Sequence, residues 1–308
     1  MLRFYAADEV HAALDYPRLA EALAQAFAAG AQVPVRHAHP LGGPDTLLLM
    51  PAWSDAALGV KLVTVMPGNS ARGVGTVQAI YLLLDRATGE PLALLDGEAL
   101  TLRRTAATSA LAARYLARDD AQNLLVVGAG RLAPYLACAH YALRPALRRV
   151  FFWSRDPTQA QTAAQWLRDL GLPAQAAEDL EGAAREAQII SCATTATSPV
   201  VHGAWLEPGT HLDLVGGFRP AMREIDDAAA ARSRIFVDTY AGALAEAGDL
   251  LAPLASGAIR RDSIVAELAE LVRGERRGRT GADEITMFKS VGTALEDLCA
   301  ASLVVKGG

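Results

Sequence analysis

The chain has 308 residues, 52% of them hydrophobic, and a formal net charge of -5 at pH 7. This length and hydrophobic content suffice for two buried cores. The negative charge disfavours nucleic acid as the main partner, and no apolar run approaches the roughly 20 residues that cross a bilayer. Charges throughout the amino-terminal stretch MLRFYAADEVHAALD disfavour a secretory signal, so we expect a cytoplasmic protein without membrane contact.

The cysteines and histidines do not indicate a metal centre. Cys138, Cys192 and Cys299 lie far apart and form no CxxC pair, so neither a disulfide framework nor a zinc site is expected. His37 and His39 form an H-x-H pair, but no third ligand is evident near them. We therefore expect reduced thiols and no bound metal.

The first third of the chain has the features of an α+β domain. Residues 8–29 place apolar side chains at helical spacing and predict two short helices, with Pro17 at the turn between them. Residues 46–95 contain short apolar runs separated by Pro, Gly and Asn, which predict an antiparallel sheet with a hairpin turn at DRATGEPLA. Residues 101–117 then predict a helix with Thr101 as its N-cap.

Beyond this helix, short apolar strands alternate with helical segments. Such alternation indicates a parallel sheet covered on both faces. The fold class is therefore α/β, with a Rossmann-type doubly wound parallel sheet preceded by an α+β domain. A short strand and a long helix are expected in 284–305. Strands are predicted at 124–127, 150–153, 187–192, 211–215 and 235–237, with helices that include 158–170 and 179–187.

The stretch VVGAGRLA follows the first of these strands and opens a helix. Gly128, Gly130 and Ala133 match G-x-G-x-x-A, in which the first glycine makes a tight turn and the second admits pyrophosphate close to the backbone. We therefore predict a dinucleotide site, to which Arg131 and Leu132 of the same turn also belong. The alternative is a turn that needs glycine for structural reasons alone.

The end of the second strand departs from the pattern of an NAD site, which usually has a carboxylate there for the ribose hydroxyls. Ser154 and Arg155 occupy that place, and a hydroxyl with a guanidinium suits a phosphate. NADP(H) is therefore predicted as the preferred cofactor. NAD(H) stays possible because Asp156 is acidic and follows directly. The alternative is that Arg155 is simply solvated.

Two arginines, Arg103 and Arg104, fall in the first turn of the helix predicted from Thr101, where cations oppose the helix dipole. Either the neighbouring acids Asp96 and Glu98 neutralise them, or an anion binds there.

Two further cations could join such an anion site. Lys61 lies inside an apolar strand, where a charge must be paired or face a cleft. Arg36 lies in the segment VPVRHAHP. If these cations from separate segments converge on one carboxylate, they would form a site for an amino acid or a keto acid.

The segments described so far resemble the ornithine cyclodeaminase/mu-crystallin family over nearly the whole chain. The resemblance implies a homodimer whose substrate-binding and dimerisation domain spans 1–118, with the carboxyl-terminal helix 293–308 returning to it. It also implies a Rossmann domain over 119–292 and hydride transfer between a nicotinamide and the alpha carbon of an amino or imino acid. It rests on LLLMPAW, GVKLVTVMPGN, DRATGEPLALLDG, LTLRRTAATSALAARYLA, VVGAGRLA, GTHLDLVGG followed by REID, and EITMFKSVGTALEDL.

Carried over position by position, the resemblance implies that Arg36, Lys61 and Arg104 bind the substrate carboxylate, and that Arg103 is a solvated neighbour. Lys61 is also our candidate catalytic proton donor, because burial and nearby cations lower the pKa of a lysine. Ser154 and Arg155 resemble the NADP-preferring members. The other implied cofactor contacts are Thr76, Gly128, Gly130, Thr194, Val215, Ser290 and Val291.

Two positions depart from ornithine cyclodeaminase itself. Phe218 stands where that enzyme has a catalytic Asp directly after the two glycines, and Leu48 stands where it has a Glu that orients the reacting amine. Without a carboxylate base and an amine anchor, cyclodeamination is disfavoured. Asp213 could replace the acid, although a structural role is favoured for it. Phe218 would then form an apolar wall for the substrate ring.

These observations predict an NAD(P)H-dependent reductase of cyclic ketimine carboxylates, such as pyrroline-2-carboxylate or piperideine-2-carboxylate. One alternative is ornithine cyclodeaminase or an amino-acid dehydrogenase. Another is a non-catalytic, NADPH-dependent ligand-binding protein, which Phe218 favours and the complete set of carboxylate-binding cations disfavours.

Overall fold

The computed structural model describes residues 2–307, which form two compact units. One contains the residues up to Arg104 and those from Thr293 on, and the other is Thr105–Gly292. The division lies inside helix α3 (Gly97–Leu116), whereas the sequence placed it after this helix, at residue 118. The start of α3 contacts strand β4 through Thr101, while Ala113 near its end belongs to a core of the second unit.

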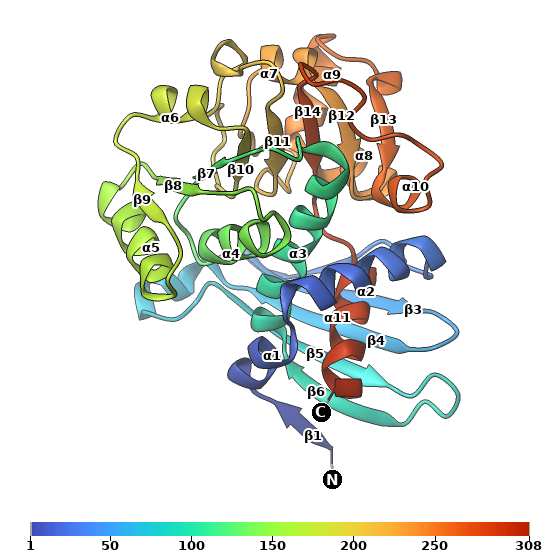
Figure 1. The fold of residues 1–308 in the computed structure, drawn as a ribbon. Coiled ribbons are helices and arrows are strands. Elements are labelled where there is room, and N and C mark those ends of the chain that lie inside the picture. Colours follow the sequence, from blue (N-terminus) through green and yellow to red (C-terminus); the bar gives the residue numbers. More distant parts are fainter. Residues whose placement is uncertain (1, 308) are drawn as a thin grey trace. The chain divides into compact units, whose positions relative to one another are not determined.

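The first unit is built on a six-stranded sheet in the order β1-β6-β5-β4-β3-β2 (Figure 1). Neighbouring strands are antiparallel except for the parallel pair β1 and β6. The antiparallel region and the hairpin between β5 and β6 are therefore confirmed. The strands are β1 (Arg3–Tyr5), β2 (His37–Gly42), β3 (Asp45–Trp53), β4 (Leu58–Val65), β5 (Val77–Leu84) and β6 (Pro91–Asp96).

The helices of this unit are α1 (Ala7–Ala13), α2 (Tyr16–Ala29), the start of α3 and α11 (Ala294–Gly307), with a 3-10 turn at Pro67–Arg72. Pro17 lies in the first turn of α2, where its missing N–H costs nothing, rather than between the helices. The Asp15 side chain caps α2 by accepting from the Arg18 N–H.

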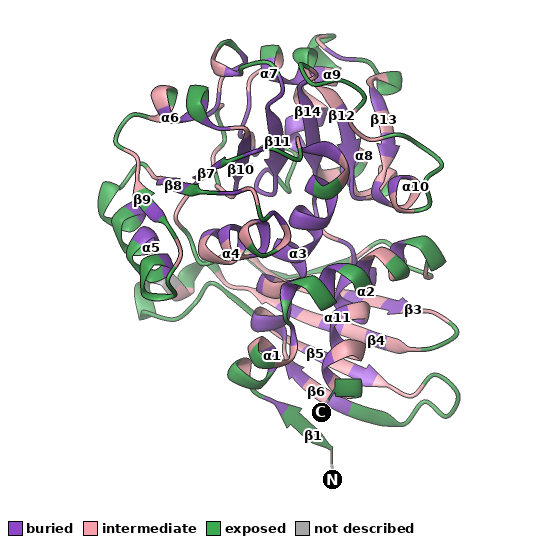
Figure 2. Ribbon diagram, viewed as in Figure 1, coloured by how far each residue is buried: buried purple, intermediate pink, exposed green. Residues whose placement is uncertain are grey.

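The two faces of the first sheet differ in burial, because side chains alternate along each strand (Figure 2). One face packs against α11, which contacts β3, β4 and β5. A buried row crosses this face through the paired positions Met50, Lys61, Tyr81 and Leu95. The opposite face is apolar but half-exposed, and it includes Leu49, Val60, Leu62, Ile80, Leu82 and Leu94.

The helix that carries Arg104 begins earlier than predicted. It starts at Gly97, and the Asp96 carboxylate accepts the Ala99 N–H over 2.8 Å in the manner of a cap. Thr101 is therefore not the N-cap, and its hydroxyl instead donates to the Gly97 carbonyl over 2.7 Å. The prediction was wrong because two cap-forming residues lie close together, Asp96 directly before this helix and Thr101 inside it. The argument that the arginines oppose the dipole in the first turn no longer applies.

The second unit contains an eight-stranded, fully parallel sheet in the order β13-β12-β14-β11-β10-β7-β8-β9. The chain runs outward from β7 through β8 to β9 and then returns to β10 on the other side of β7. This arrangement is the doubly wound topology predicted from the sequence. The strands are β7 (Asn123–Val127), β8 (Arg149–Trp153), β9 (Ala174–Ala176), β10 (Ile189–Cys192), β11 (His211–Leu214), β12 (Arg234–Val237), β13 (Ile264–Glu267) and β14 (Thr286–Lys289).

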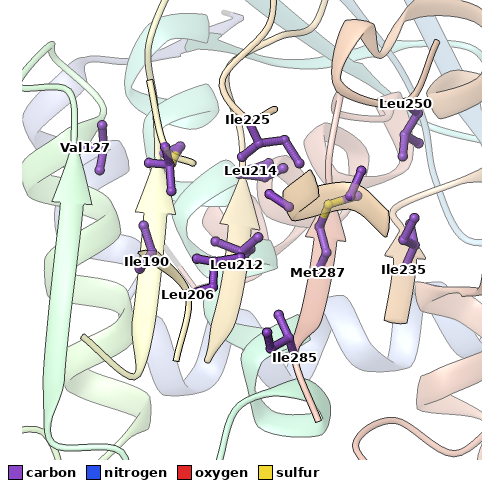
Figure 3. Close-up of a cluster of buried hydrophobic side chains, with 14 of the residues drawn as sticks. Val127, Ile190, Leu206, Leu212, Leu214, Ile225, Ile235, Leu250, Ile285 and Met287 are labelled. Carbon is purple, nitrogen blue, oxygen red and sulfur yellow. The ribbon is translucent and has the colours of Figure 1, made fainter. Parts of the chain in front are cut away.

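Alternate residues of these strands enter two separate cores, one on each face of the sheet. On β7, Val127 belongs to one core and Val126 to the other. Figure 3 shows the first core, in which Val127, Ile190, Leu212 and Met287 project from neighbouring strands. The helices are α4 (Ala133–Leu143), α5 (Pro157–Asp169), α6 (Leu180–Glu186), α7 (Asp227–Arg232), α8 (Tyr240–Glu246), α9 (Gly248–Ser256) and α10 (Leu268–Val272), with 3-10 turns at Gly203–Trp205 and Arg261–Ser263.

Among the described residues, no helix is long and apolar enough to cross a membrane. Within 2–307, no three His, Cys, Asp or Glu side chains gather in a way that could hold a metal ion.

Candidate functional site

A buried ionic cluster in the first unit is formed by Lys61, Arg104, Glu296 and Asp297. Lys61 projects from β4 and Arg104 from α3, and they are only 3% and 5% exposed. Lys61 Nζ lies 2.8 Å from Asp297 Oδ2, and Arg104 Nε donates to Asp297 Oδ1 over 3.0 Å. Arg104 Nη1 also pairs with Glu296. One carboxylate therefore bridges two of the three cations that the sequence assigned to substrate binding.

Burial and charge act in opposite directions within this cluster. Burial lowers the pKa of Lys61 to about 8, although the Asp297 carboxylate favours the protonated form. Burial would also lower the pKa of Arg104, but Asp297 and Glu296 raise it above its usual value. For Asp297, the raising effect of burial is outweighed by Arg104 and Lys61, so its pKa is lowered. Lys61 is therefore the member that can exchange its proton near neutral pH.

Tyr81, which sequence reasoning missed, lies beside Lys61 on β5. It is fully buried, and its hydroxyl has no hydrogen-bond partner among the described residues. A Cβ added to Gly59 would lie 2.3 Å from this hydroxyl, so Gly59 makes room for the ring. Burial, with a contribution from Asp297, raises the pKa of Tyr81 well above its usual value. The hydroxyl is therefore protonated at neutral pH.

Arg36 and Arg103 are the other two cations of the first unit that the sequence analysis considered. Arg36 is half-buried directly before β2. Arg103 is not the solvated residue that was predicted, because its Nε donates to His11 Nδ1 over 3.2 Å and its Nη2 to the His11 carbonyl over 2.9 Å. Its guanidinium also lies 4.8 Å from the centre of the Tyr16 ring. Arg103 therefore ties α3 to the first two helices, and the acids that neutralise Arg104 come from α11.

In the second unit, the residues assigned to the cofactor follow the carboxyl ends of adjacent parallel strands. The order β14-β11-β10-β7-β8 brings five strand ends together at one edge of the sheet. Ligands of doubly wound sheets bind at this edge, near the point where the strand order reverses. The residues are Ser290 and Val291 after β14, Val215 after β11, Thr194 after β10, Gly128 to Leu132 after β7, and Ser154 and Arg155 after β8.

The glycine turn fits a dinucleotide pyrophosphate. Gly128 has φ +101°, its N–H donates to the Trp153 carbonyl over 2.8 Å, and an added Cβ would lie 2.7 Å from the Ala193 carbonyl oxygen. Only glycine fits there. At Gly130, no atom lies within 4 Å of an added Cβ, so the backbone is open to close approach. Gly128 thus shapes the turn, while Gly130 leaves space for a phosphate.

Thr194 after β10 and Gly216 after β11 are held by a buried polar network that sequence reasoning missed. The Thr194 N–H and hydroxyl donate to Glu224 Oε1 over 2.7 and 2.9 Å. Lys289 Nζ lies 3.0 Å from Asp249 Oδ2 and also donates to the Gly216 carbonyl. Asp249 Oδ1 accepts the Glu224 N–H over 2.6 Å. Burial, with the charge of Asp249, raises the pKa of Glu224 to about 8 against the opposing effect of Lys289.

Asp238 is a second buried residue that the sequence did not reveal. Its Oδ2 accepts the N–H groups of Val291 and Gly292 over 2.8 and 2.7 Å, and the Ser290 hydroxyl over 3.3 Å. It therefore shapes the loop that carries Ser290 and Val291. Two features of the sequence could have revealed these buried residues. Lysine is scarce in the chain, which draws attention to Lys289, and several acids lie inside otherwise apolar segments.

Asp156, the acid that follows Ser154 and Arg155 after β8, belongs to the start of α5. Its carboxylate caps α5 by accepting the Thr158 N–H over 3.0 Å and the Thr158 hydroxyl over 2.6 Å. Ser154 is half-buried and Arg155 is exposed directly before it. Asp156 is thus engaged in its own helix.

Several predicted positions remain separate from these clusters. Phe218 follows Gly217 and is 39% exposed. Leu48 lies on the same face of the first sheet as Lys61, because both belong to its α11 side by strand alternation. Thr76 lies in the first unit, in an exposed segment before β5. Asp213 is buried in the second unit, where it accepts from Ser191 over 2.6 Å and lies 3.2 Å from His140 Nε2, as expected for a structural role.

Comparison with known proteins places the chain in one family. The model of the ornithine cyclodeaminase/mu-crystallin family matches residues 5–306. The Delta(1)-pyrroline-2-carboxylate reductase of Paracoccus denitrificans is 43% identical over 268 residues, which cover 86% of this chain and 85% of that protein.

Two solved structures extend the comparison. The Delta(1)-pyrroline-2-carboxylate reductase of Thermococcus litoralis, in complex with NADH and L-proline, is 34% identical with a TM-score of 0.94, covering 100% of this chain and 97% of that one. The iminosuccinate reductase of Paracoccus denitrificans, in complex with NAD+, is 28% identical with a TM-score of 0.91, covering 99% and 96%. A nicotinamide dinucleotide is therefore the cofactor type of this fold.

Proposed function

Because the chain belongs to the ornithine cyclodeaminase/mu-crystallin family, we propose that it is an NAD(P)H-dependent reductase that converts pyrroline-2-carboxylate to proline. The observation that carries the proposal is the buried pair of cations Lys61 and Arg104, which Asp297 bridges. We assign Lys61 the role of proton donor and Arg104 that of binding the substrate carboxylate. Leu48 and Phe218 support reduction over cyclodeamination, because neither supplies a carboxylate. The names of the relatives favour a five-membered ring over a six-membered one.

The reduction requires three tasks of the protein. Arg104 and Arg36 hold the substrate carboxylate through charge-assisted hydrogen bonds. The residues at the strand ends of the second unit, among them Gly128, Gly130 and Thr194, would hold the nicotinamide dinucleotide, which would supply the hydride for the carbon of the C=N bond. The Lys61 ammonium gives a proton to the ring nitrogen, so that C=N becomes CH–NH and Lys61 is left as a neutral amine that regains its proton from solvent. A donor pKa of about 8 suits transfer near neutral pH.

Oxidation of NADPH and NADH by the purified protein tests this proposal. The panel contains pyrroline-2-carboxylate, piperideine-2-carboxylate and iminosuccinate, beside ornithine with NAD(P)+ and an ammonia assay. We expect saturable oxidation that is fastest with pyrroline-2-carboxylate, and no ammonia from ornithine. Ammonia and proline from ornithine would instead establish the cyclodeaminase. Tight NADPH binding without any turnover would establish a binding protein and contradict the reductase.

We also propose a preference for NADPH over NADH. The exposed Arg155 and the neighbouring Ser154 hydroxyl offer donors for a phosphate at the end of β8. Asp156 supports this preference, because a carboxylate engaged in capping α5 is not free to bind ribose hydroxyls.

A homodimer through the first sheet is the last part of the proposal. The face opposite α11 presents half-exposed Val60, Leu62, Ile80 and Leu82 on adjacent strands. Contiguous apolar surface of this kind favours a covering partner. A second copy of the chain, which the resemblance also implies, would cover it.

A further inference from the structure

The two acids in the first turn of α11 are fully buried. Glu296 and Asp297 have 0% exposure, and a buried carboxylate is costly unless it is paired. Both are paired with cations of the ionic cluster. Two carboxylates and two cations leave this cluster formally neutral. Its acids therefore need an explanation beyond attraction for a substrate carboxylate, which they would weaken.

Asp297 differs from Glu296 in the contacts that it makes. Asp297 contacts both cations directly, Lys61 through Oδ2 at 2.8 Å and Arg104 through Oδ1 at 3.0 Å. Glu296 pairs with the other end of the Arg104 guanidinium. Asp297 thus sets the separation of the two cations, while Glu296 acts on one of them.

The contacts of Lys61 use only part of its capacity to donate hydrogen bonds. An ammonium has three donors. Lys61 Nζ donates a hydrogen bond to Thr101 Oγ1 over 3.3 Å and forms an ion pair with Asp297 Oδ2 at 2.8 Å. The Thr101 hydrogen is engaged by the Gly97 carbonyl, so its oxygen serves as an acceptor. The hydrogen bond and the ion pair engage part of the ammonium, and the described residues offer its remaining donor no hydrogen-bond partner.

We infer that Asp297 is a positioning residue of the reaction, which holds Lys61 and Arg104 at a fixed separation and leaves the third Lys61 N–H for the substrate nitrogen. The inference rests on the proposed reductase function. Misplacement of a reacting group by about 1 Å costs on the order of 10²-fold in rate. A residue that touches neither substrate nor cofactor can therefore control turnover through Lys61.

The first test measures Lys61 directly. The chain contains only three lysines, Lys61, Lys289 and Lys306, so NMR of protein labelled at lysine gives three titration curves, and K61R assigns the one of interest. The wild-type protein, D297N and E296Q are titrated without substrate. Because the Asp297 charge favours protonated Lys61, D297N should lower the Lys61 midpoint clearly and E296Q less. An unchanged midpoint in D297N would overturn the inference.

The second test separates position from charge. D297E keeps the charge but moves the carboxylate by one methylene group. The inference predicts a Lys61 midpoint near that of the wild type, yet a kcat reduced by about 10-fold or more because the donor is displaced. E296Q should change mainly KM and leave kcat near that of the wild type, since Glu296 forms its ion pair with Arg104. A normal kcat in both D297E and D297N would show that Asp297 is merely structural.

Controls are needed to distinguish loss of positioning from loss of folding, and failure of this inference from failure of the proposed function. Far-UV circular dichroism and thermal unfolding show whether each variant is folded. The lysine titration needs no turnover, so it still tests the coupling of Asp297 to Lys61 if the wild-type protein reduces no cyclic imine. In that case the proposed function fails, and with it the role of Asp297 in the reaction, whereas the electrostatic coupling is judged separately by the D297N midpoint.

Discussion

At the scale of single residues, burial decides what Lys61 can do. An exposed lysine stays protonated far above neutral pH, whereas Lys61 is held between a sheet and α11 with a pKa of about 8. Its paired carboxylate prevents a larger decrease. The same surroundings keep Arg104 charged, so one buried cation can release a proton while its neighbour cannot.

Replacing Lys61 with Met should therefore lower kcat by about 10²-fold or more, since a general acid contributes about that much. In the wild type, Lys61 donates only when protonated, so activity should be present below pH 8 and be lost as the pH rises through about 8. Steady-state kinetics across this range check both points. K306M, at an exposed lysine of α11, is the matched control. A K61M enzyme with normal kcat would refute the role of donor.

Arg155 supports a second prediction at this scale. R155A should weaken NADPH binding by about 10-fold while NADH binding changes little, because a lost charge-assisted contact to a phosphate is worth about 1.4 kcal/mol or more. Nicotinamide fluorescence titration measures both constants. R149A removes an exposed arginine at the opposite end of the same strand and should affect neither. Tighter NADH than NADPH binding in the wild type would contradict the preference.

At the scale of elements, the ends of parallel strands are shaped by neighbouring loops. The turn after β7 needs glycine at two positions for different reasons. Gly128 is required by a positive φ and by the close Ala193 carbonyl, whereas Gly130 borders open space. The ends of β10, β11 and β14 are held by buried side chains instead, through the hydrogen bonds of Glu224 and Asp249 and the ion pair of Asp249 with Lys289.

Substituting the two glycines should therefore have different effects, one on the stability of the fold and the other on cofactor binding. G128A should destabilise the protein, since a Cβ 2.7 Å from a carbonyl oxygen forces the backbone to move. G130A should leave the unfolding temperature unchanged but weaken dinucleotide binding by about 10-fold, because a methyl group obstructs the phosphate. Thermal unfolding and fluorescence titration measure these effects. Tight cofactor binding by G130A would show that the pyrophosphate does not approach this turn.

At the scale of the whole molecule, the half-exposed apolar face of the first sheet is the surface through which we propose that two copies associate. L62E should convert a dimer into a folded monomer, because the new charge is tolerated in water but not against apolar surface. Sedimentation analysis measures the mass, and L170E, at an exposed position after α5, is the control. A monomeric wild type, or a dimer that survives L62E, would contradict this interface.

Much of the fold could be predicted from local patterns. Strand and helix periods identified the antiparallel sheet, the doubly wound unit and the glycine turn, because each depends on residues close in sequence. The start of α3 was misplaced, since Asp96 and Thr101 are both cap-forming residues and only packing selects between them. Arg103 was misjudged because its partner His11 lies 92 residues away.

By itself, the sequence determined the fold class and the position of the glycine turn after β7, since these follow from periodicity, spacing and residue type. The choice of Lys61 and of Arg104 rather than Arg103 came from the resemblance to a family. Only the tertiary structure decided which charges meet. Asp297 lies 193 residues from Arg104, and Glu224 lies 30 residues from Thr194. The residues close in sequence to an acid in a helix do not predict which distant cation it pairs with. Its pairing depends on how α11 packs on the sheet, and packing is a property of the folded chain.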